Sequence, residues 1–274
     1  MPEHSIRQAR QRSSGTLAAS RHHCHGTLLV RALWALLAAL LLSTWATAQS
    51  AEDPYRAERE RLVDQTIARG SLLGRTPVED ERVLEALRTT PRHEFVPERH
   101  RAQAYADRPL PIGHGQTISQ PYIVAIMTEM LEVEPGDRVL EIGAGSGYHA
   151  AVIAEIVDEV YTIEIVEELG EEAKERLERL EYDNVFVRVG DGYHGWADKA
   201  PFDAIVVTAA AAHIPPPLVE QLKPGGKMVI PVGPPFMTQN LVIVSKLEDG
   251  SIRQRNVMPV RFVPFTRAAE GDED

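Results

Sequence analysis

The chain has 274 residues, of which 43% are hydrophobic and 25% are charged, and its formal net charge is −11 at pH 7. This acidic balance argues against nucleic acid as a partner, because a polyanion is held by clustered Lys and Arg side chains. The single cysteine, Cys24, excludes a disulfide framework within the chain.

The first predicted element is an apolar run near the amino terminus. Residues 32–42 read Ala-Leu-Trp-Ala-Leu-Leu-Ala-Ala-Leu-Leu-Leu behind Arg31, and Ala46-Thr-Ala48 follows. This pattern is typical of a secretory signal peptide, here residues 1–48 with cleavage after Ala48. The run of 11 residues is short for a membrane span of about 20. We therefore expect an exported protein, periplasmic or secreted, that meets the membrane only through this segment.

Two alternatives to a cleaved signal stay open. The segment can remain as an uncleaved anchor, and the protein is cytoplasmic if the first 48 residues are not a functional signal. Cleavage after Ala48 removes five arginines, one glutamate and Cys24, so the remaining chain carries a formal net charge of −15 and no thiol. A protein without thiols tolerates an oxidising compartment.

Residues 49–115 are predicted to form a helical extension and a loop. A first helix is expected over 57–68. A second is expected to begin at a capping box over 76–79, with Pro77 at its first helical position, and its apolar stripe runs toward Pro91. Prolines at 97, 109 and 111 indicate a loop over 93–115. The extension either forms one wall of a binding groove or only packs over a sheet edge.

Thr117 and Ser119 come before a predicted helix over 120–131. The helix has one apolar face: Ile123, Ile126, Met127, Met130 and Leu131. Ser119 is expected at the N-cap, where its hydroxyl, the free N–H groups and the helix dipole favour an anion. Alternatively, Ser119 only caps the helix, a contribution of about 1 kcal/mol, and the Thr117 hydroxyl bonds only its own backbone.

Residues 138–147 read Arg-Val-Leu-Glu-Ile-Gly-Ala-Gly-Ser-Gly, a buried strand that runs into a turn with glycine at alternate positions. Gly143, Gly145 and Gly147 let the backbone turn sharply and approach a ligand closely. The spacing is not the G-x-G-x-x-G of dinucleotide-binding folds, and Glu141 stands two residues before the first glycine. The motif resembles the first motif of the class I methyltransferases that use S-adenosylmethionine; a plain strand-to-helix turn is the alternative.

Two more acidic residues close the next two predicted strands. After a helix over 148–156, the strand 160–163 ends on Glu164, whose carboxylate can accept hydrogen bonds from both hydroxyls of a ribose; a solvated charge is the alternative. A charged helix over 167–181 leads to the strand 185–189, which ends in Gly190-Asp191-Gly192. There Asp191 can accept from an adenine amine, and Gly192 clears space beside it. Three acids at three successive strand ends indicate a nucleoside site.

The remaining pattern completes an α/β fold. The pattern predicts, in chain order, a strand over 202–208, a helix over 215–222, a turn over 223–226 and strands over 227–232, 241–245 and 257–263. This alternation predicts a doubly wound, mostly parallel seven-stranded sheet with helices on both faces, which is a Rossmann-like methyltransferase fold. Residues 116–267 are assigned to this core and residues 268–274 to an acidic tail.

Several segments together resemble the protein-L-isoaspartate O-methyltransferase family, in the same order from about residue 59 to 266. The most specific is 110–121, Leu-Pro-Ile-Gly-His-Gly-Gln-Thr-Ile-Ser-Gln-Pro, because few methyltransferases carry Gly-x-Gly-x-Thr-Ile-Ser ahead of the glycine turn. The others are 139–148, 190–192, 200–210, 221–226, 229–233 and 260–264.

The resemblance implies methyl transfer from S-adenosyl-L-methionine to the free α-carboxylate of L-isoaspartyl residues in damaged proteins or peptides. A carboxylate with a reference pKa of about 3.9 is already ionised at neutral pH, so it needs no general base, and orientation can supply up to about 7–11 kcal/mol. On this interpretation Thr117 and Ser119 are the catalytic donors. The cofactor residues are Glu141, Gly143, Gly145, Gly147, Glu164, Asp191 and Gly192.

Some features depart from the family or favour other roles. Some relatives carry a histidine soon after the serine, whereas this chain has Tyr122, Ile123 and Val124 there. His149 follows the glycine turn, where it could touch a cofactor, but it is interpreted as an exposed residue of a first helical turn. By the resemblance Thr266 could line the substrate cleft, but it is interpreted as a polar tail residue. The histidines at 93, 100, 114, 149, 194 and 213 show no pairing at metal-ligand spacing, and His22-His-Cys-His25 is not a convincing metal site, so no metal is expected. We expect a monomer.

Two other classes of function are weighed. A non-catalytic binding module in protein quality control outside the cytosol is disfavoured by the acids at 141, 164 and 191. A nicotinamide oxidoreductase is disfavoured by the missing G-x-G-x-x-G. Export conflicts with a cofactor that is made and used in the cytosol.

Overall fold

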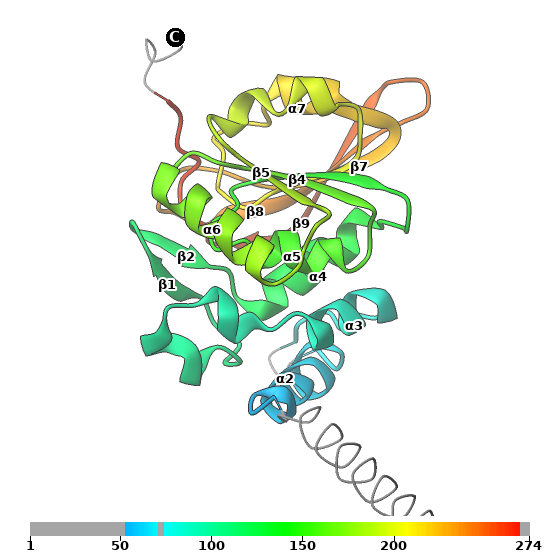
Figure 1. Cartoon of the computed structure of the whole chain (residues 1–274). Coiled ribbons are helices and arrows are strands. Elements are labelled where there is room, and N and C mark those ends of the chain that lie inside the picture. Colours follow the sequence, from blue (N-terminus) through cyan, green and yellow to red (C-terminus); the bar gives the residue numbers. More distant parts are fainter. Residues whose placement is uncertain (1–52, 71–73, 269–274) are drawn as a thin grey trace, which may run out of the picture. The chain divides into compact units, whose positions relative to one another are not determined.

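The alternating pattern folds into one mixed sheet in the computed structural model, which describes residues 53–70 and 74–268. The spatial order of the strands is β5-β4-β3-β6-β7-β8-β9 (Figure 1). Their bounds are β3 Arg138–Ile142, β4 Glu159–Glu164, β5 Val185–Val189, β6 Phe202–Val207, β7 Leu222–Val232, β8 Gln239–Lys246 and β9 Ile252–Val260.

The first five of these strands along the chain are parallel, and the last two are antiparallel to their neighbours. The chain winds outward from β3 to β4 and β5, then returns to the other side of β3 with β6. The predicted doubly wound sheet is therefore confirmed. The direction of winding reverses between β3 and β6, and ligands of such sheets bind beside that point, at the carboxyl ends of the strands.

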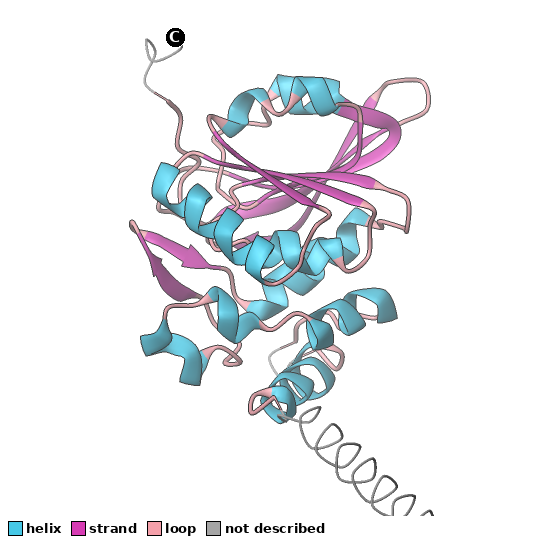
Figure 2. Ribbon diagram, viewed as in Figure 1, coloured by secondary structure: helices cyan, strands magenta, loops and turns pink. Residues whose placement is uncertain are grey.

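Helices cover both faces of the sheet (Figure 2). On one face lie α4 (Pro121–Leu131), α5 (Tyr148–Ala154) and α6 (Glu167–Arg179), and on the other lies α7 (Pro216–Gln221). Successive side chains of a strand point to opposite faces. Accordingly, Val139 packs in the core beside α4 and α5, whereas Leu140 and Ile142 pack in the core that contains Leu218 of α7.

Two helices precede the sheet, as predicted. The first is α2 (Arg56–Leu62), which continues as the π-helix η1 (Val63–Ile67), and the second is α3 (Glu81–Thr89). The expected capping box over 76–79 is wrong, because α3 begins four residues later behind Asp80, whose side chain accepts from the N–H of Arg82. The backbone N–H groups of Glu79 and Asp80 instead donate to Oε1 of Glu129 in α4, at 2.6 and 2.8 Å.

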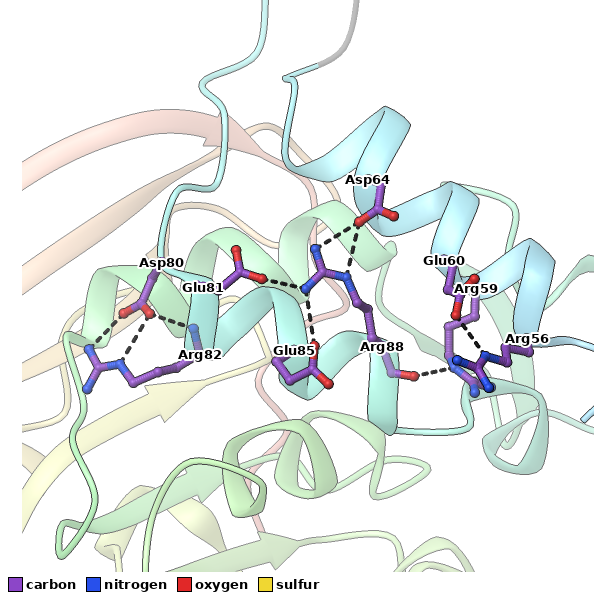
Figure 3. A network of polar contacts seen from close by, with 9 residues as sticks. All are labelled: Arg56, Arg59, Glu60, Asp64, Asp80, Glu81, Arg82, Glu85 and Arg88. Carbon is purple, nitrogen blue, oxygen red and sulfur yellow. Dashed lines mark hydrogen bonds and ion pairs between the residues drawn. The ribbon is translucent and has the colours of Figure 1, made fainter. Parts of the chain in front are cut away.

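Arg88 ties the two helices together on their outer side (Figure 3). Its guanidinium lies 2.8 Å from Asp64, 2.6 Å from Glu81 and 3.2 Å from Glu85. The three carboxylates are half or more exposed, so each pair contributes little. Burial of Leu84 and other apolar residues is therefore the main cause of this packing.

The segment expected as a loop over 93–115 contains regular structure that the prolines concealed. It holds the 3₁₀-helices η2 (Arg92–Phe95) and η3 (Glu98–Gln103) and the strand β1 (Leu110–Gly113), which pairs with β2 (Gln116–Ile118). Pro111 lies opposite Thr117 in this two-stranded sheet. Proline is tolerated there because the strand is at an edge. The hairpin holds Thr117 in extended backbone.

Several element boundaries differ from the predictions. Helix α5 ends at Ala154, two residues early. Strand β7 begins at Leu222, and the expected turn over 223–226 is a bulge within it, between the pairs Phe202–Leu222 and Ala204–Lys227. Strand β9 ends at Val260, since the next residues leave the sheet and the carbonyl of Val263 accepts from the N–H of Ala210.

The predicted signal peptide over 1–48 and the acidic tail beyond residue 268 lie outside the described residues. Within the described parts, no helix combines the length and the apolar character needed to cross a bilayer.

Gly147 is expected to be required for packing. Its φ is 84°, and an added Cβ would lie 3.1 Å from Cδ1 of Leu177 in α6. Gly250 has a similar φ of 81° with open space around it. We expect Gly250→Ala to lower the free energy of unfolding by about 1–2 kcal/mol, the cost of a left-handed residue, and Gly147→Ala to lower it further. Urea denaturation of both variants checks this. Equal losses of stability would show that α6 shifts to accommodate the added methyl group.

Candidate active site

A cavity opens at the carboxyl ends of β3, β4 and β6, where the winding reverses. It encloses about 770 Å³, its open mouth included. Seven of the nine residues that the sequence singles out line it: Thr117, Ser119, Glu141, Gly143, Gly145, Glu164 and Gly192. The structure therefore brings these separate motifs together around one cavity, whereas Gly147 and Asp191 are not part of its lining.

Two glycines in the wall permit contacts that a side chain would prevent. At Gly143, with φ 97°, an added Cβ would lie 2.3 Å from Oγ1 of Thr208. The Thr208 hydroxyl lies 2.7 Å from the carbonyl oxygen of Gly143 and 3.0 Å from that of Ile142, so it ties β6 to the turn after β3. At Gly192, an added Cβ would lie 2.4 Å from Cγ2 of Ile142. Thr208 was missed from the sequence, although its place at the end of β6 is a signal.

Glu164 closes β4 and is buried, with 6% of its surface exposed. Its Oε2 accepts from the N–H of Gly145 at 2.7 Å, and its Oε1 accepts from the N–H of Val166 at 3.1 Å. Each carboxylate oxygen has a further lone pair. The side chain therefore supports the glycine turn and keeps acceptor capacity on the cavity wall.

Glu141 is a fully buried carboxyl group on the cavity wall. Its Oε2 accepts from the hydroxyl of Thr162 at 2.6 Å, but its Oε1 is buried without a hydrogen-bond partner in the described part of the chain. Burial raises the pKa of Glu141 to about 8, against the opposing effect of the Thr162 hydrogen bond. An unsatisfied buried oxygen of this kind favours a ligand that brings a donor or a positive charge.

His149 is buried, so its interpretation as an exposed first-turn residue is wrong. The hydroxyl of Thr128 in α4 donates to the carbonyl of Val124 at 2.8 Å, so it accepts from Nε2 of His149, 3.0 Å away. That bond assigns the ring proton to Nε2 and leaves Nδ1 as an acceptor. Burial lowers the pKa of His149 to about 3, so a neutral imidazole lines the cavity.

Ser119 is not the N-cap of α4, contrary to the prediction. Gln120 holds that position and makes no side-chain capping bond, because Pro121 is the first residue of the helix. Ser119 lies one residue earlier, half-buried, between β2 and α4. Thr117, on β2, is exposed. Both residues line the cavity, so the structure brings them to the site without the helix-capping geometry.

Asp191 and Gly147 lie at the edge of the site. Asp191 Oδ1 accepts from the N–H of Tyr193 at 2.9 Å, and Oδ2 lies 2.8 Å from Nε of Arg267. Burial acts to raise the pKa of Asp191, but the bonds from Arg267 and the backbone outweigh it and lower the pKa. A contact between Asp191 and an adenine amine stays a prediction. Gly147 packs against α6, and its cofactor contact likewise stays a prediction.

A second, wider cavity adjoins the first. The two share Gln116, Thr117, Ser119, Thr208, Val263, Pro264 and Thr266, so Thr266 lines both and is not merely a tail residue. The charged side chains in the lining of the second cavity are Arg75 and Arg261. Arg75 pairs with Asp107 at 2.6 Å, whereas Arg261 is exposed. Phe236, 83% exposed, lies on its rim.

Within residues 53–70 and 74–268, no group of three or more His, Cys, Asp or Glu side chains is arranged to hold a metal ion.

Comparison with known proteins connects this geometry to a family. The sequence profile of the family described as protein-L-isoaspartate(D-aspartate) O-methyltransferase matches residues 58–270. Protein-L-isoaspartate O-methyltransferase 2 of Syntrophobacter fumaroxidans is 58% identical over 238 residues, which are 85% of this chain and 96% of that protein. The enzyme of the same name from Polaromonas sp. is 62% identical over 190 residues, 69% of this chain and 90% of that protein.

A solved structure is similar as well. It is described as a protein-L-isoaspartate O-methyltransferase from Plasmodium falciparum in complex with S-adenosyl-L-homocysteine. The TM-score is 0.64 at 26% sequence identity, over 77% of this chain and 99% of that one.

Glu141 is expected to make stability depend on pH. Its folded-state pKa of about 8 lies above its ordinary value of 4.5, so its contribution to the free energy of unfolding is complete below pH 4.5 and is lost as the pH rises to 8. Glu141→Gln carries no such loss. The variant should therefore gain stability relative to wild type as the pH rises from 5 to 8.

Urea denaturation at several pH values measures this difference. Glu220→Gln, at an exposed glutamate of α7, is the control and should run parallel to wild type. A constant difference between Glu141→Gln and wild type would mean that Glu141 is ionised in the folded protein.

Proposed function

Since this chain belongs to the protein-L-isoaspartate(D-aspartate) O-methyltransferase family, we propose that Thr117 and Ser119 hold its acceptor carboxylate beside the methyl donor. The chain is an enzyme that transfers a methyl group from S-adenosyl-L-methionine to the free α-carboxylate of L-isoaspartyl residues in damaged proteins or peptides, which starts their repair. The observation that carries the proposal is that Thr117 and Ser119 belong to both cavities.

The first cavity suits the methyl donor. Its wall combines glycine backbone with the buried, unpartnered oxygen of Glu141, which suits a ligand that brings a hydrogen-bonding partner. Glu164 is proposed to hold the ribose hydroxyls, beside Gly145 and Gly192 in the same cavity wall. When bound, S-adenosyl-L-methionine supplies an electrophilic methyl group on a sulfonium centre. The neutral imidazole of His149 adds no positive charge that would oppose such a ligand.

The residues of this chain then need to orient, and not to activate, the acceptor. An α-carboxylate is ionised at neutral pH, so the site requires hydrogen-bond donors and no base. The hydroxyls of Thr117 and Ser119 are such donors, and fixing the acceptor in place is worth up to about 7–11 kcal/mol. Catalysis here is therefore mainly positioning.

The second cavity is proposed to receive the peptide chain on either side of the isoaspartyl residue. It meets the first cavity at Thr117 and Ser119, so a peptide lying in it presents its carboxylate to both hydroxyls. Its charged lining residues are both arginines, in a chain of net charge −11. Exposed Arg261 therefore favours acidic residues near the damaged site, and Phe236 offers an apolar contact.

Residues 1–48 are proposed to direct export, with cleavage after Ala48 and a periplasmic or secreted product. The support is the apolar run over 32–42 followed by Ala-Thr-Ala, and the family match begins only at residue 58. Cell fractionation and amino-terminal sequencing of the purified protein test this. A cytosolic protein that retains residues 1–48 would contradict it.

Ser119→Ala is expected to slow turnover more than it weakens cofactor binding. Loss of one donor to the acceptor should lower kcat for an isoaspartyl peptide by about tenfold or more, while the Kd for S-adenosyl-L-homocysteine changes by less than about threefold. Methyl-labelled cofactor, the isoaspartyl peptide and its aspartyl twin give the rate, and calorimetry gives the Kd. Ser251→Ala, in the exposed β8–β9 turn, is the control. An unchanged kcat would assign Ser119 a purely structural role.

Arg261→Glu is expected to change which peptides are methylated. The ratio of kcat/KM for glutamate-flanked over lysine-flanked isoaspartyl peptides should fall by about three- to tenfold, and more at low salt, because the favourable charge becomes unfavourable. Arg253→Glu makes the same charge change on β9, outside the lining of both cavities. If both variants shift the ratio equally, net charge and not the second cavity selects the peptide.

A further inference from the structure

A buried arginine outside both cavities contacts the residues that line them. Arg92, the first residue of η2, is completely buried. Its Nη2 donates to the carbonyl oxygen of Ser119 at 2.7 Å, and its Nε donates to the carbonyl oxygen of Ala104 at 2.9 Å. The centre of the guanidinium lies 4.7 Å from the ring centroid of Tyr148, the first residue of α5. One side chain thus connects the extension, the Ser119 segment and the helix after the glycine turn.

The cost of burying this group indicates a function beyond packing. Arg92 forms no ion pair with an Asp or Glu side chain of the described residues, and its Nη1 is buried without a hydrogen-bond partner. Burial lowers the pKa of the guanidinium, but an arginine stays protonated in proteins. Because an unpaired buried charge is expensive, an apolar side chain of similar size would serve packing alone at lower cost.

The backbone at Ser119 has few other supports. Thr117 and Ile118 are fixed by pairing with β1, and α4 begins only at Pro121. Asp107 holds the start of the helix, because its Oδ1 accepts from the N–H of Tyr122 at 3.0 Å and its Oδ2 from Nε2 of Gln120 at 2.9 Å. Ser119 lies between these two supports, and the bond from Arg92 reaches its carbonyl.

We propose that Arg92 is a positioning residue that fixes the Ser119 peptide group at a set distance from the glycine turn, acting through the ring of Tyr148. Tyr148 also lines the first cavity. The Arg92 side chain therefore links the wall of that cavity to the Ser119 segment, whose hydroxyl is proposed to bind the acceptor carboxylate. A misplacement of about 1 Å at a reacting centre can cost about a hundredfold in rate. The inference rests on the function proposed for Ser119.

The test compares Arg92→Met and Arg92→Lys with Arg59→Met. Arg59 is a second buried arginine that donates to a backbone carbonyl, that of Arg88, and to a tyrosine hydroxyl, that of Tyr105 (Figure 3 shows the first bond). It does not line either cavity. The readouts are thermal unfolding, calorimetric Kd for S-adenosyl-L-homocysteine, and kcat and KM for an isoaspartyl peptide, at a temperature where every variant is folded.

We expect Arg92→Met to lower kcat by about 10- to 100-fold with a Kd within about threefold of wild type, and Arg92→Lys to restore part of the rate. Arg59→Met should keep kcat within about twofold at a comparable loss of stability. A wild-type kcat in Arg92→Met, or an equal loss of kcat in Arg59→Met, would overturn the inference. If Arg92→Met does not fold, the kcat of Arg92→Lys decides in its place, since a wild-type value would contradict the proposal.

The double variant Ser119→Ala/Arg92→Lys separates this inference from the proposed function. Ser119→Ala removes the hydroxyl but keeps the carbonyl oxygen that Arg92 binds. If Arg92 acts through the Ser119 hydroxyl, the kcat of the double variant is therefore no lower than that of Ser119→Ala alone. Additive losses would refute that route. Slow Ser119→Ala with normal Arg92 variants would reject only the inference, whereas normal Ser119→Ala with slow Arg92 variants would reject the role of Ser119.

Discussion

The reversal of winding between β3 and β6 is the constraint on which the site depends. Neighbouring parallel strands are normally followed by crossovers that cover their ends, but here the crossovers leave in opposite directions and the end of β3 stays open. Gly143 keeps the turn at that end free of a side chain, so Thr208 of β6 can bond its carbonyl. The sheet therefore holds the open carboxyl end of β3 in a fixed position, and the functional groups of the site surround that end.

The electrostatics of the site match the reaction of the family. Glu141 is buried with one oxygen unpartnered, Glu164 supports the glycine turn, and His149 is neutral because burial disfavours its charged form. No positive charge among these groups opposes a positively charged donor. On the other side, the hydroxyls of Thr117 and Ser119 are proposed to hold an acceptor that is already an anion. A methyl transfer between such partners needs no proton acceptor, so the precision of the framework is what the protein contributes.

The sequence predicted the donor side of the site better than the acceptor side, for a physical reason. Glu141, Gly143 and Glu164 follow from local rules, since a buried strand, its terminal acid and a glycine turn lie within a few residues. Ser119 was placed one position wrong because Pro121 fixes the start of α4. The burial of His149 depends on Thr128, and the contact of Arg92 with Ser119 spans 27 positions. Such long-range contacts leave no periodic signal.

The shared wall between the two cavities has a consequence for the kinetic order of the enzyme. On the proposed assignment, donor and peptide lie against different residues, since Glu164 and Gly192 line only the first cavity and Arg75 and Arg261 only the second. Neither reactant has to pass through the space of the other. We therefore expect the spent donor and the methyl ester to dissociate in either order.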